Sequence, residues 1–191
     1  MKHIKLASAI AFVMGAAVSA SSFAAPAGSG GTITFTGQIN DTTCTVTGGT
    51  GTNEGTGNFI VALDPADANQ LATVGATANQ KQFDVIFSGP NCASGKTAYM
   101  SYMLSSPQID AGTGALKNAL SGEATNVQIQ LADSSKTAIN LANPGQSWST
   151  LIGATTANTG KLSFFAQYLA VNGPATPGKV STSVVYSVVY N

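Results

Sequence analysis

The stretch Gly31–Cys44 reads GTITFTGQINDTTC, and the rest of the chain is best interpreted outward from it. Apolar residues and glycines alternate with threonine and glutamine, the period of two that is typical of a strand with one buried face. The apolar face consists of Gly31, Ile33, Phe35, Gly37 and Ile39. No turn folds this strand back on a neighbour, so its partner must lie elsewhere. We expect Gly37 to mark a point where the backbone approaches a narrow groove.

The composition is that of a folded domain with few charges. The chain has 191 residues, of which 43% are apolar and 8% are charged, and its formal net charge is zero. Such a chain can bury a core, which excludes disorder, and its length predicts one domain. Two of its lysines, Lys2 and Lys5, lie at the extreme N-terminus. The remaining six cannot build a basic face, so we expect no nucleic-acid partner.

The first residues have the pattern of an export signal. A basic start, Met1–Lys5, precedes the apolar run Leu6–Ala20, and Ser22 and Ala24 are small residues at the positions that signal peptidase reads. The run is shorter than the roughly 20 residues that span a bilayer. We predict that residues 1–24 are a signal peptide and that the mature chain is exported.

The two cysteines, Cys44 and Cys92, predict a disulfide bond formed in an oxidising compartment. This bridge would close a long loop and contribute on the order of 4 kcal/mol in the chain-entropy account. A metal site and a catalytic thiol are the rival interpretations. The one histidine, His3, lies in the predicted signal peptide, and the chain has no arginine. We therefore expect neither an enzyme nor a metal or cofactor site.

Short alternating segments separated by turn residues recur along the remaining chain. The predicted strands are residues 44–47, 58–63, 81–88, 97–104, 126–132, 136–141 and 162–171. One helical turn is expected at Pro65–Leu71, with Asp64 as its N-cap. Trp148, the single tryptophan, is expected to pack within a loop. Many short strands with almost no helical periodicity predict an all-β fold, an antiparallel β-sandwich.

The last strand is predicted at Val180–Tyr190, with Asn191 after it. Its apolar face consists of Val180, Thr182, Val184, Tyr186, Val188 and Tyr190. An immunoglobulin-like sandwich needs a further strand beside this one. The strand near the start of the chain has no sheet to join, and the sheet that contains the last strand lacks one strand. These two defects are complementary.

Several motifs occur together in this chain. They are GGTITFTG before Cys44, the second cysteine Cys92, ATNVQIQ at 124–130, FAQY at 165–168, Gly178, and Tyr190 as the penultimate residue. In this combination the chain resembles the chaperone-usher major pilins, close to the type 1 fimbrial major subunit family, over essentially its whole length. The resemblance implies an incomplete immunoglobulin-like antiparallel β-sandwich that lacks its last strand. Residues 25–40 would be a donor-strand extension, and residues 41–191 the pilin domain.

The resemblance also implies how the chain works. The fold would be completed by donor-strand exchange, first with a periplasmic chaperone and then with the N-terminal extension of the next identical or related subunit. An outer-membrane usher would assemble these subunits into fimbriae on the cell surface, which support cell adhesion. The implied groove for the inserted strand is formed by Gly178, Val180, Val184, Tyr186, Val188 and Tyr190. No small-molecule substrate is expected.

Other functions stay open from the sequence. A minor one-domain adapter or adhesive subunit near the pilus tip would have the same layout. The family's two-domain tip adhesins carry an extra binding domain and lack a donor strand, whereas this chain has the strand. An exported enzyme is disfavoured because no acid-base constellation remains. A structural polymer subunit is favoured because complementary strand defects have no use in a monomer.

Overall fold

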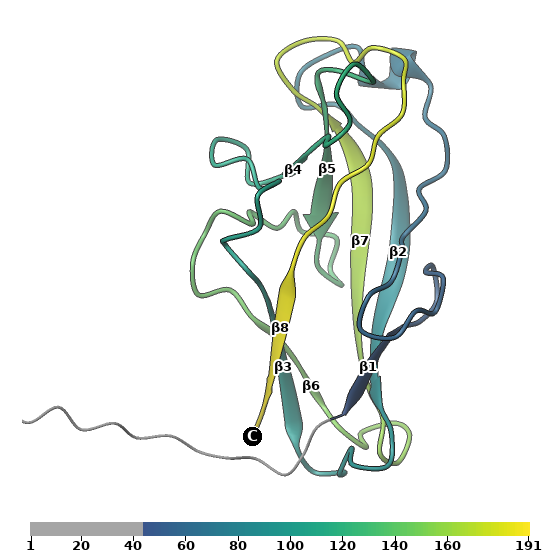
Figure 1. Cartoon of the computed structure of the whole chain (residues 1–191), viewed down its shortest axis with the longest axis vertical. Helices are drawn as coiled ribbons and strands as arrows, with labels where there is room; N and C mark the ends of the chain where they lie inside the picture. Colours follow the sequence, from purple (N-terminus) through teal and green to yellow (C-terminus); the bar gives the residue numbers. More distant parts are fainter. Residues whose placement is uncertain (1–43) are drawn as a thin grey trace, which may run out of the picture. The chain divides into compact units, whose positions relative to one another are not determined.

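The protein is represented by a computed structural model, in which residues 44–191 are described. These residues form eight strands and one short 3-10 helix (Figure 1). The elements are β1 Thr45–Gly48, η1 Ala68–Leu71, β2 Thr77–Ser88, β3 Thr97–Tyr102, β4 Leu116–Lys117, β5 Val127–Ala132, β6 Trp148–Leu151, β7 Gly160–Ala170 and β8 Tyr186–Tyr190. They make two antiparallel sheets, in the orders β1-β2-β7-β5-β4 and β6-β3-β8. The predicted all-β antiparallel fold is confirmed.

The larger sheet is centred on the pairing of β2 with β7. Their register places Phe83 opposite Phe164 and Val85 opposite Leu162. Phe83, Val85 and Phe87 are buried, as their alternation predicted. Strand β2 begins at Thr77, earlier than predicted, because its pairing with β7 continues on the far side of a bulge between Ala78 and Lys81.

The smaller sheet contributes aromatic rings to the core between the sheets. The ring of Tyr102 lies 5.5 Å from that of Trp148, and these two rings lie 5.7 Å and 5.5 Å from Phe164, all edge-on. Edge-on aromatic packing stabilises a core beyond the area it buries. Trp148 is thus a core residue in β6, and its predicted loop position is wrong. Four residues of strand give too little alternation to be found in a sequence.

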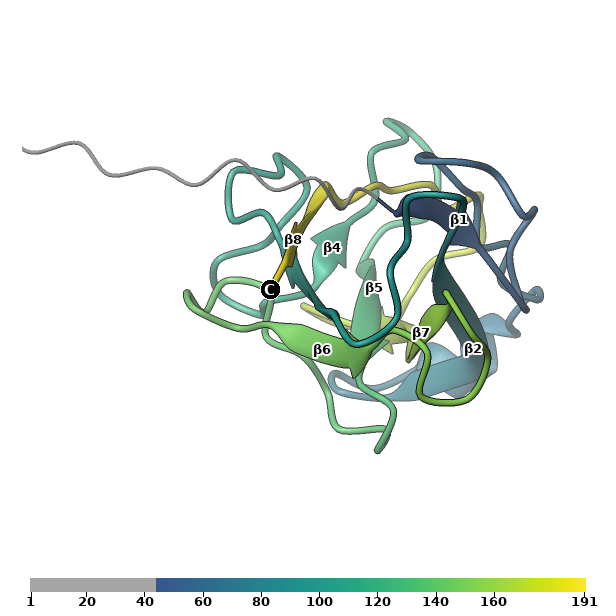
Figure 2. The same cartoon turned by 90° about the horizontal axis from the view of Figure 1, so that it is seen from below.

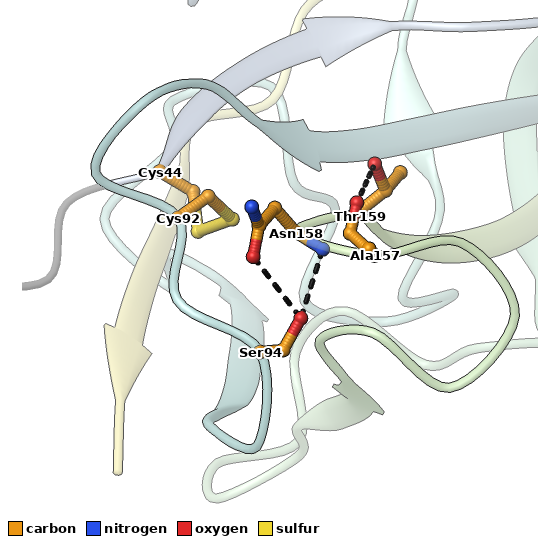
Figure 3. The surroundings of a disulfide bond; sticks show 6 residues. All are labelled: Cys44, Cys92, Ser94, Ala157, Asn158 and Thr159. Atoms are coloured by element: carbon orange, nitrogen blue, oxygen red, sulfur yellow. Dashed lines mark hydrogen bonds between the residues drawn. A yellow bond between two sulfur atoms is a disulfide. The ribbon is translucent and has the colours of Figure 1, made fainter.

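The predicted disulfide is confirmed. Cys44 and Cys92 are bonded at 2.06 Å, which joins the residue before β1 to the loop after β2 (Figure 3). In the same loop, the Ser94 hydroxyl donates to Asn158 Oδ1 at 3.1 Å and accepts from the Asn158 backbone N–H at 2.9 Å. The end of the sandwich at which β1 begins is therefore tied both covalently and by hydrogen bonds.

The strand predicted at residues 58–63 is absent from the structure. Phe59, Val61 and Leu63 do alternate as half-buried positions between exposed ones. Their backbone, however, is joined to a loop: the Asn53 N–H donates to the Ile60 carbonyl, and the Ile60 N–H donates to the Asn53 side chain. Alternation reports one covered face, and among residues 44–191 this segment has no neighbouring strand of the kind that a ladder requires.

The helical turn begins later than predicted, because Asp67 rather than Asp64 is its N-cap. The Asp67 side chain accepts from the Asn69 N–H, and the Gln70 side chain accepts from the Asp67 N–H, which completes a capping box. The carbonyl groups of Asp64 and Pro65 instead accept from the side chain of Asn79. These bonds keep the two residues outside the helix.

Residues 136–141 pair with β5 less than predicted. A single bridge joins Ala132 to Ala138, and the Leu141 N–H donates to the Gly114 carbonyl instead. The pairing cannot extend because the two-residue strand β4 occupies the same edge of β5. Strand β4, like β6, was not predicted, since two residues carry no periodic signal.

Candidate functional site

The C-terminal segment 179–191 makes its backbone bonds through odd-numbered residues. Asn191 exchanges two bonds with Thr97, and the Val185 carbonyl accepts from the Met103 N–H. Farther up, Ser181 bonds to Ala119 and to the Asn118 side chain. The Lys179 N–H donates to Glu123 Oε2 at 2.8 Å, and the Lys179 carbonyl accepts from the Asn118 side chain. Strand β8 is shorter than the predicted Val180–Tyr190, yet this one-sided bonding spans the whole predicted range.

The opposite edge of this segment is open within the part of the chain that the structure describes. In an antiparallel pair, successive residues direct their backbone groups to alternate sides. Since the odd-numbered residues face β3 and its neighbours, the backbone groups of Tyr186 and Val188 face away from β3. Strand β8 is the last strand of its sheet in the order β6-β3-β8. In Figure 2, β8 and the outer strand β1 of the other sheet both lie toward the top of the view.

The inward side chains of the same segment cover the core incompletely. The half-buried apolar side chains packed against the core from this segment are Val180, Val184, Tyr186, Val188 and Tyr190. The Thr182 hydroxyl is buried and has no hydrogen-bond partner in the described region. An inner strand of a sandwich would normally have several fully buried positions. We call this combination of one-sided backbone and half-buried side chains the open edge.

A second apolar row faces the open edge from residues 57–63 and from β2. The ring of Phe59 lies 6.0 Å from that of Tyr186, and the Tyr186 hydroxyl donates to the Gly57 carbonyl at 2.6 Å. At the other end, Tyr190 lies edge-on to Phe87 at 6.5 Å. Phe59 belongs to the segment that was wrongly predicted as a strand. Its alternation with Val61 and Leu63 did, however, indicate this apolar row in the sequence.

A cavity of about 560 Å³ adjoins the start of the open edge. It is lined by η1 and the residues before it, by Tyr168 of β7, and by residues 175–180. Gly178 lies in this lining at a positive φ of 150°, and a Cβ there would clash with the backbone nitrogen of Ala124. Only glycine fits this conformation and this close approach.

The chemistry of the open edge is hydrogen bonding and apolar contact. Burial raises the pKa of the Tyr186 and Tyr190 phenols, so both hydroxyls are neutral at physiological pH. The backbone N–H of Cys44 donates to the Tyr190 hydroxyl. Among residues 44–191, no group of three or more His, Cys, Asp or Glu side chains could hold a metal ion. The arrangement suits an extended peptide better than a small charged ligand.

The predicted site residues are only partly covered by the structure. It brings together the predicted groove residues, from Gly178 at the cavity to Tyr190 at the far end. The predicted donor residues, from Gly31 to Ile39, lie outside the described residues, as does the predicted signal peptide. No helix within residues 44–191 is long and apolar enough to cross a membrane.

Comparison with known proteins places the chain among fimbrial subunits. The family model described as fimbrial protein matches residues 33–191. The major fimbrial subunit SMF-1 of Stenotrophomonas maltophilia is 35% identical over 169 residues, which cover 84% of this chain and 92% of that protein. The F17 fimbrial protein of Escherichia coli is 35% identical over 185 residues, and the type-1 fimbrial protein A chain of E. coli K12 is 30% identical over 190. These two alignments each cover 95% of this chain, and 98% and 97% of the relatives.

A solved structure supports the fold. The P pilus rod subunit PapA superposes with a TM-score of 0.53 over 84% of this chain and all of that chain, at 15% sequence identity. At this identity the likeness shows the immunoglobulin-like pilin fold alone. The family match and the identities to the curated relatives carry the assignment. The chain belongs to the fimbrial protein family, whose members are structural pilus subunits rather than enzymes.

Proposed function

We propose that the chain polymerises by donor-strand exchange. Residues Gly31–Ile39 of one subunit would lie along the open edge of the next, with Ile33, Phe35 and Ile39 directed into the core. The exported chain would first be held by a periplasmic chaperone and passed by an outer-membrane usher into extracellular fimbriae that support adhesion. The chain would serve as a repeated structural subunit of the fibre.

The observation that supports this proposal is the one-sided bonding of residues 179–191. A free edge with apolar side chains beneath it is unstable in water and prone to unwanted pairing. A strand inserted beside it would bond the backbone of Tyr186 and Val188 and cover their half-buried side chains. Burying three large apolar donor side chains would contribute roughly 1.5 to 3 kcal/mol each.

The test is thermal unfolding of the refolded domain, residues 41–191, with and without a peptide of residues 28–39. At a peptide concentration about 100 times its Kd, binding adds roughly 2.7 kcal/mol to the free energy of unfolding. For a domain of this size we expect the Tm to rise by roughly 5 to 10 °C. An unchanged Tm at saturating peptide would sink the proposal.

Two matched peptides locate the contact. Gly37→Arg places a long side chain on the inserted face, and we expect it to abolish the gain in Tm. Gln38→Arg places the same side chain on the opposite face, and we expect the gain to be kept. In the whole chain, Gly37→Arg should give normal chaperone complexes and no fibres, since each subunit's own groove is unchanged. Fibres at the normal level would show that this stretch is not the donor.

A further inference from the structure

The C-terminal segment has two kinds of neighbour on its bonded side. Strand β8 pairs with β3 along its whole length. Strand β3 ends at Tyr102, and beyond it a single bond, from the Met103 N–H to the Val185 carbonyl, continues the ladder. Residues 179–184 continue above β8 as irregular chain (Figure 1). Within the described part of the chain, this first stretch of the open edge therefore has no strand to support it.

The side chain of Asn118 takes the place of the missing strand. Its Nδ2 donates to the Lys179 carbonyl at 2.9 Å, and its Oδ1 accepts from the Ser181 N–H at 3.0 Å. A primary amide offers the same donor and acceptor as a peptide group, so Asn118 bonds the segment as a strand residue would. The same amide donates to the Ala124 carbonyl at 3.0 Å and accepts from the Leu120 N–H at 3.2 Å, which fixes its orientation.

Two further side chains complete this support. The Glu123 carboxylate accepts from the Lys179 N–H at 2.8 Å, and the buried Ser106 hydroxyl accepts from the Val185 N–H at 3.0 Å. Each of these side chains bonds one residue of the segment, whereas Asn118 bonds two and is itself anchored in its own loop. Loss of Asn118 would therefore release more of the segment than loss of either neighbour.

We propose that Asn118 is a positioning residue for strand insertion, which holds residues 179–181 extended before the donor arrives. The inference rests on the proposed function. A site that is formed only part of the time binds more weakly by that fraction, and a site held in its bound conformation avoids this loss. Asn118 contacts the bonded side of the segment and the donor would contact the open side, so Asn118 acts through the segment.

The direction of the donor decides which of its ends depends on Asn118. Each strand pair in the described region is antiparallel. An antiparallel donor would place Ile39, near its C-terminal end, beside residues 179–181. Ile33 would lie farther along, beside β8, where the backbone of β3 already supports the edge. The contribution of Ile39 should therefore depend on Asn118, and that of Ile33 should not.

The test is a pair of double-mutant cycles in fibres of the full mature chain. Every subunit supplies both a donor and an open edge, so the two substitutions of a double variant meet at each junction. The rate at which monomers are released in warm detergent measures the junction. With Asn118 intact, Ile33→Ala and Ile39→Ala should each speed release by about tenfold or more, since each removes buried apolar groups.

We expect Asn118→Ala alone to speed release about tenfold. It should also reduce the effect of Ile39→Ala at least about threefold and leave the effect of Ile33→Ala unchanged. A general loss of stability would speed release without preferring one end of the donor. Asn140→Ala is the matched control, because it removes a side chain bond that stays within residues 140–142, and it should couple to neither isoleucine.

An unchanged release rate in Asn118→Ala would overturn the proposal, as would equal coupling to both isoleucines or coupling to Ile33 alone. If Asn118→Ala forms no fibres, Asn118→Asp gives the same cycles, because it keeps the acceptor for the Ser181 N–H and loses the donor to the Lys179 carbonyl. The absence of any effect of Ile33→Ala and Ile39→Ala with Asn118 intact is a different result, because it rejects the proposed function instead.

Discussion

Gly178 combines two constraints at one residue, a positive φ and a clash between any Cβ and the Ala124 backbone. We expect Gly178→Ala to lower the free energy of unfolding of the peptide-bound domain by about 2 to 3 kcal/mol. Gly122→Ala is the matched control, because Gly122 also has a positive φ but has open space around its Cβ position. It should cost about 1 kcal/mol. Urea unfolding measures both, and equal losses would contradict the steric account.

Asp84 is a buried carboxylate whose surroundings keep it charged. Burial raises its pKa, but hydrogen bonds from Ser163 and Gln82 and the charge of Lys161 outweigh burial, so the pKa lies below its ordinary value. A carboxyl with a depressed folded pKa stabilises the fold above its unfolded pKa. This contribution is lost as the pH falls through the folded value.

Asp84→Asn should therefore destabilise the domain by about 1 to 2 kcal/mol at neutral pH. The difference from the unsubstituted chain should shrink as the pH falls below the ordinary carboxyl range, because that chain loses the same contribution. Urea unfolding at about pH 7 and about pH 2.5 makes the comparison, and Glu54→Gln controls for the loss of one exposed negative charge. A deficit that is constant across this range would contradict the prediction.

At the scale of elements, β8 directs alternate side chains to the two faces of its sheet. Val188 points inward at the open edge and Val189 points outward. We expect Val188→Ala to weaken binding of the donor peptide about tenfold, since two lost methyl groups correspond to roughly 1.5 kcal/mol. Val189→Ala should leave peptide affinity unchanged. Titration of labelled peptide into the domain gives both constants, and an equal effect at the two positions would refute the assignment of faces.

Much of the C-terminal strand was predictable from the sequence, and the contacts that were not predicted were missed for a physical reason. The inward set from Val180 to Tyr190 follows from period-two alternation, which reports side chain direction. The bonding of Lys179 and Ser181 to the side chains of Asn118 and Glu123 joins residues far apart in sequence, which alternation does not report. Phe59 was found as an alternating residue but misassigned to a strand, because alternation does not identify a backbone partner.

At the scale of the whole molecule, the disulfide links the start of β1 to the loop between the two sheets. We expect replacement of both Cys44 and Cys92 by serine to lower the free energy of unfolding by about 2 to 4 kcal/mol. The cell should contain less subunit, whereas the fibres that still assemble should be little altered, because the unfolded chain is removed before assembly. Quantitative blotting of subunit and fibre gives the ratio, and free-thiol titration of the unsubstituted fibre should find no reactive thiol.

The same bridge has a mechanical consequence for the proposed fibre. Tension carried by the donor segment would enter each domain at Cys44, where β1 offers four residues paired to β2. Pulling from that end would peel β1 away one pair at a time. The Cys44–Cys92 bond diverts the load into the segment between β2 and β3, past the weak β1 pairing. Stretching single fibres before and after reduction should show that domains open at lower force once the bridge is cut, which would make the disulfide a covalent tether under tension along the proposed fibre.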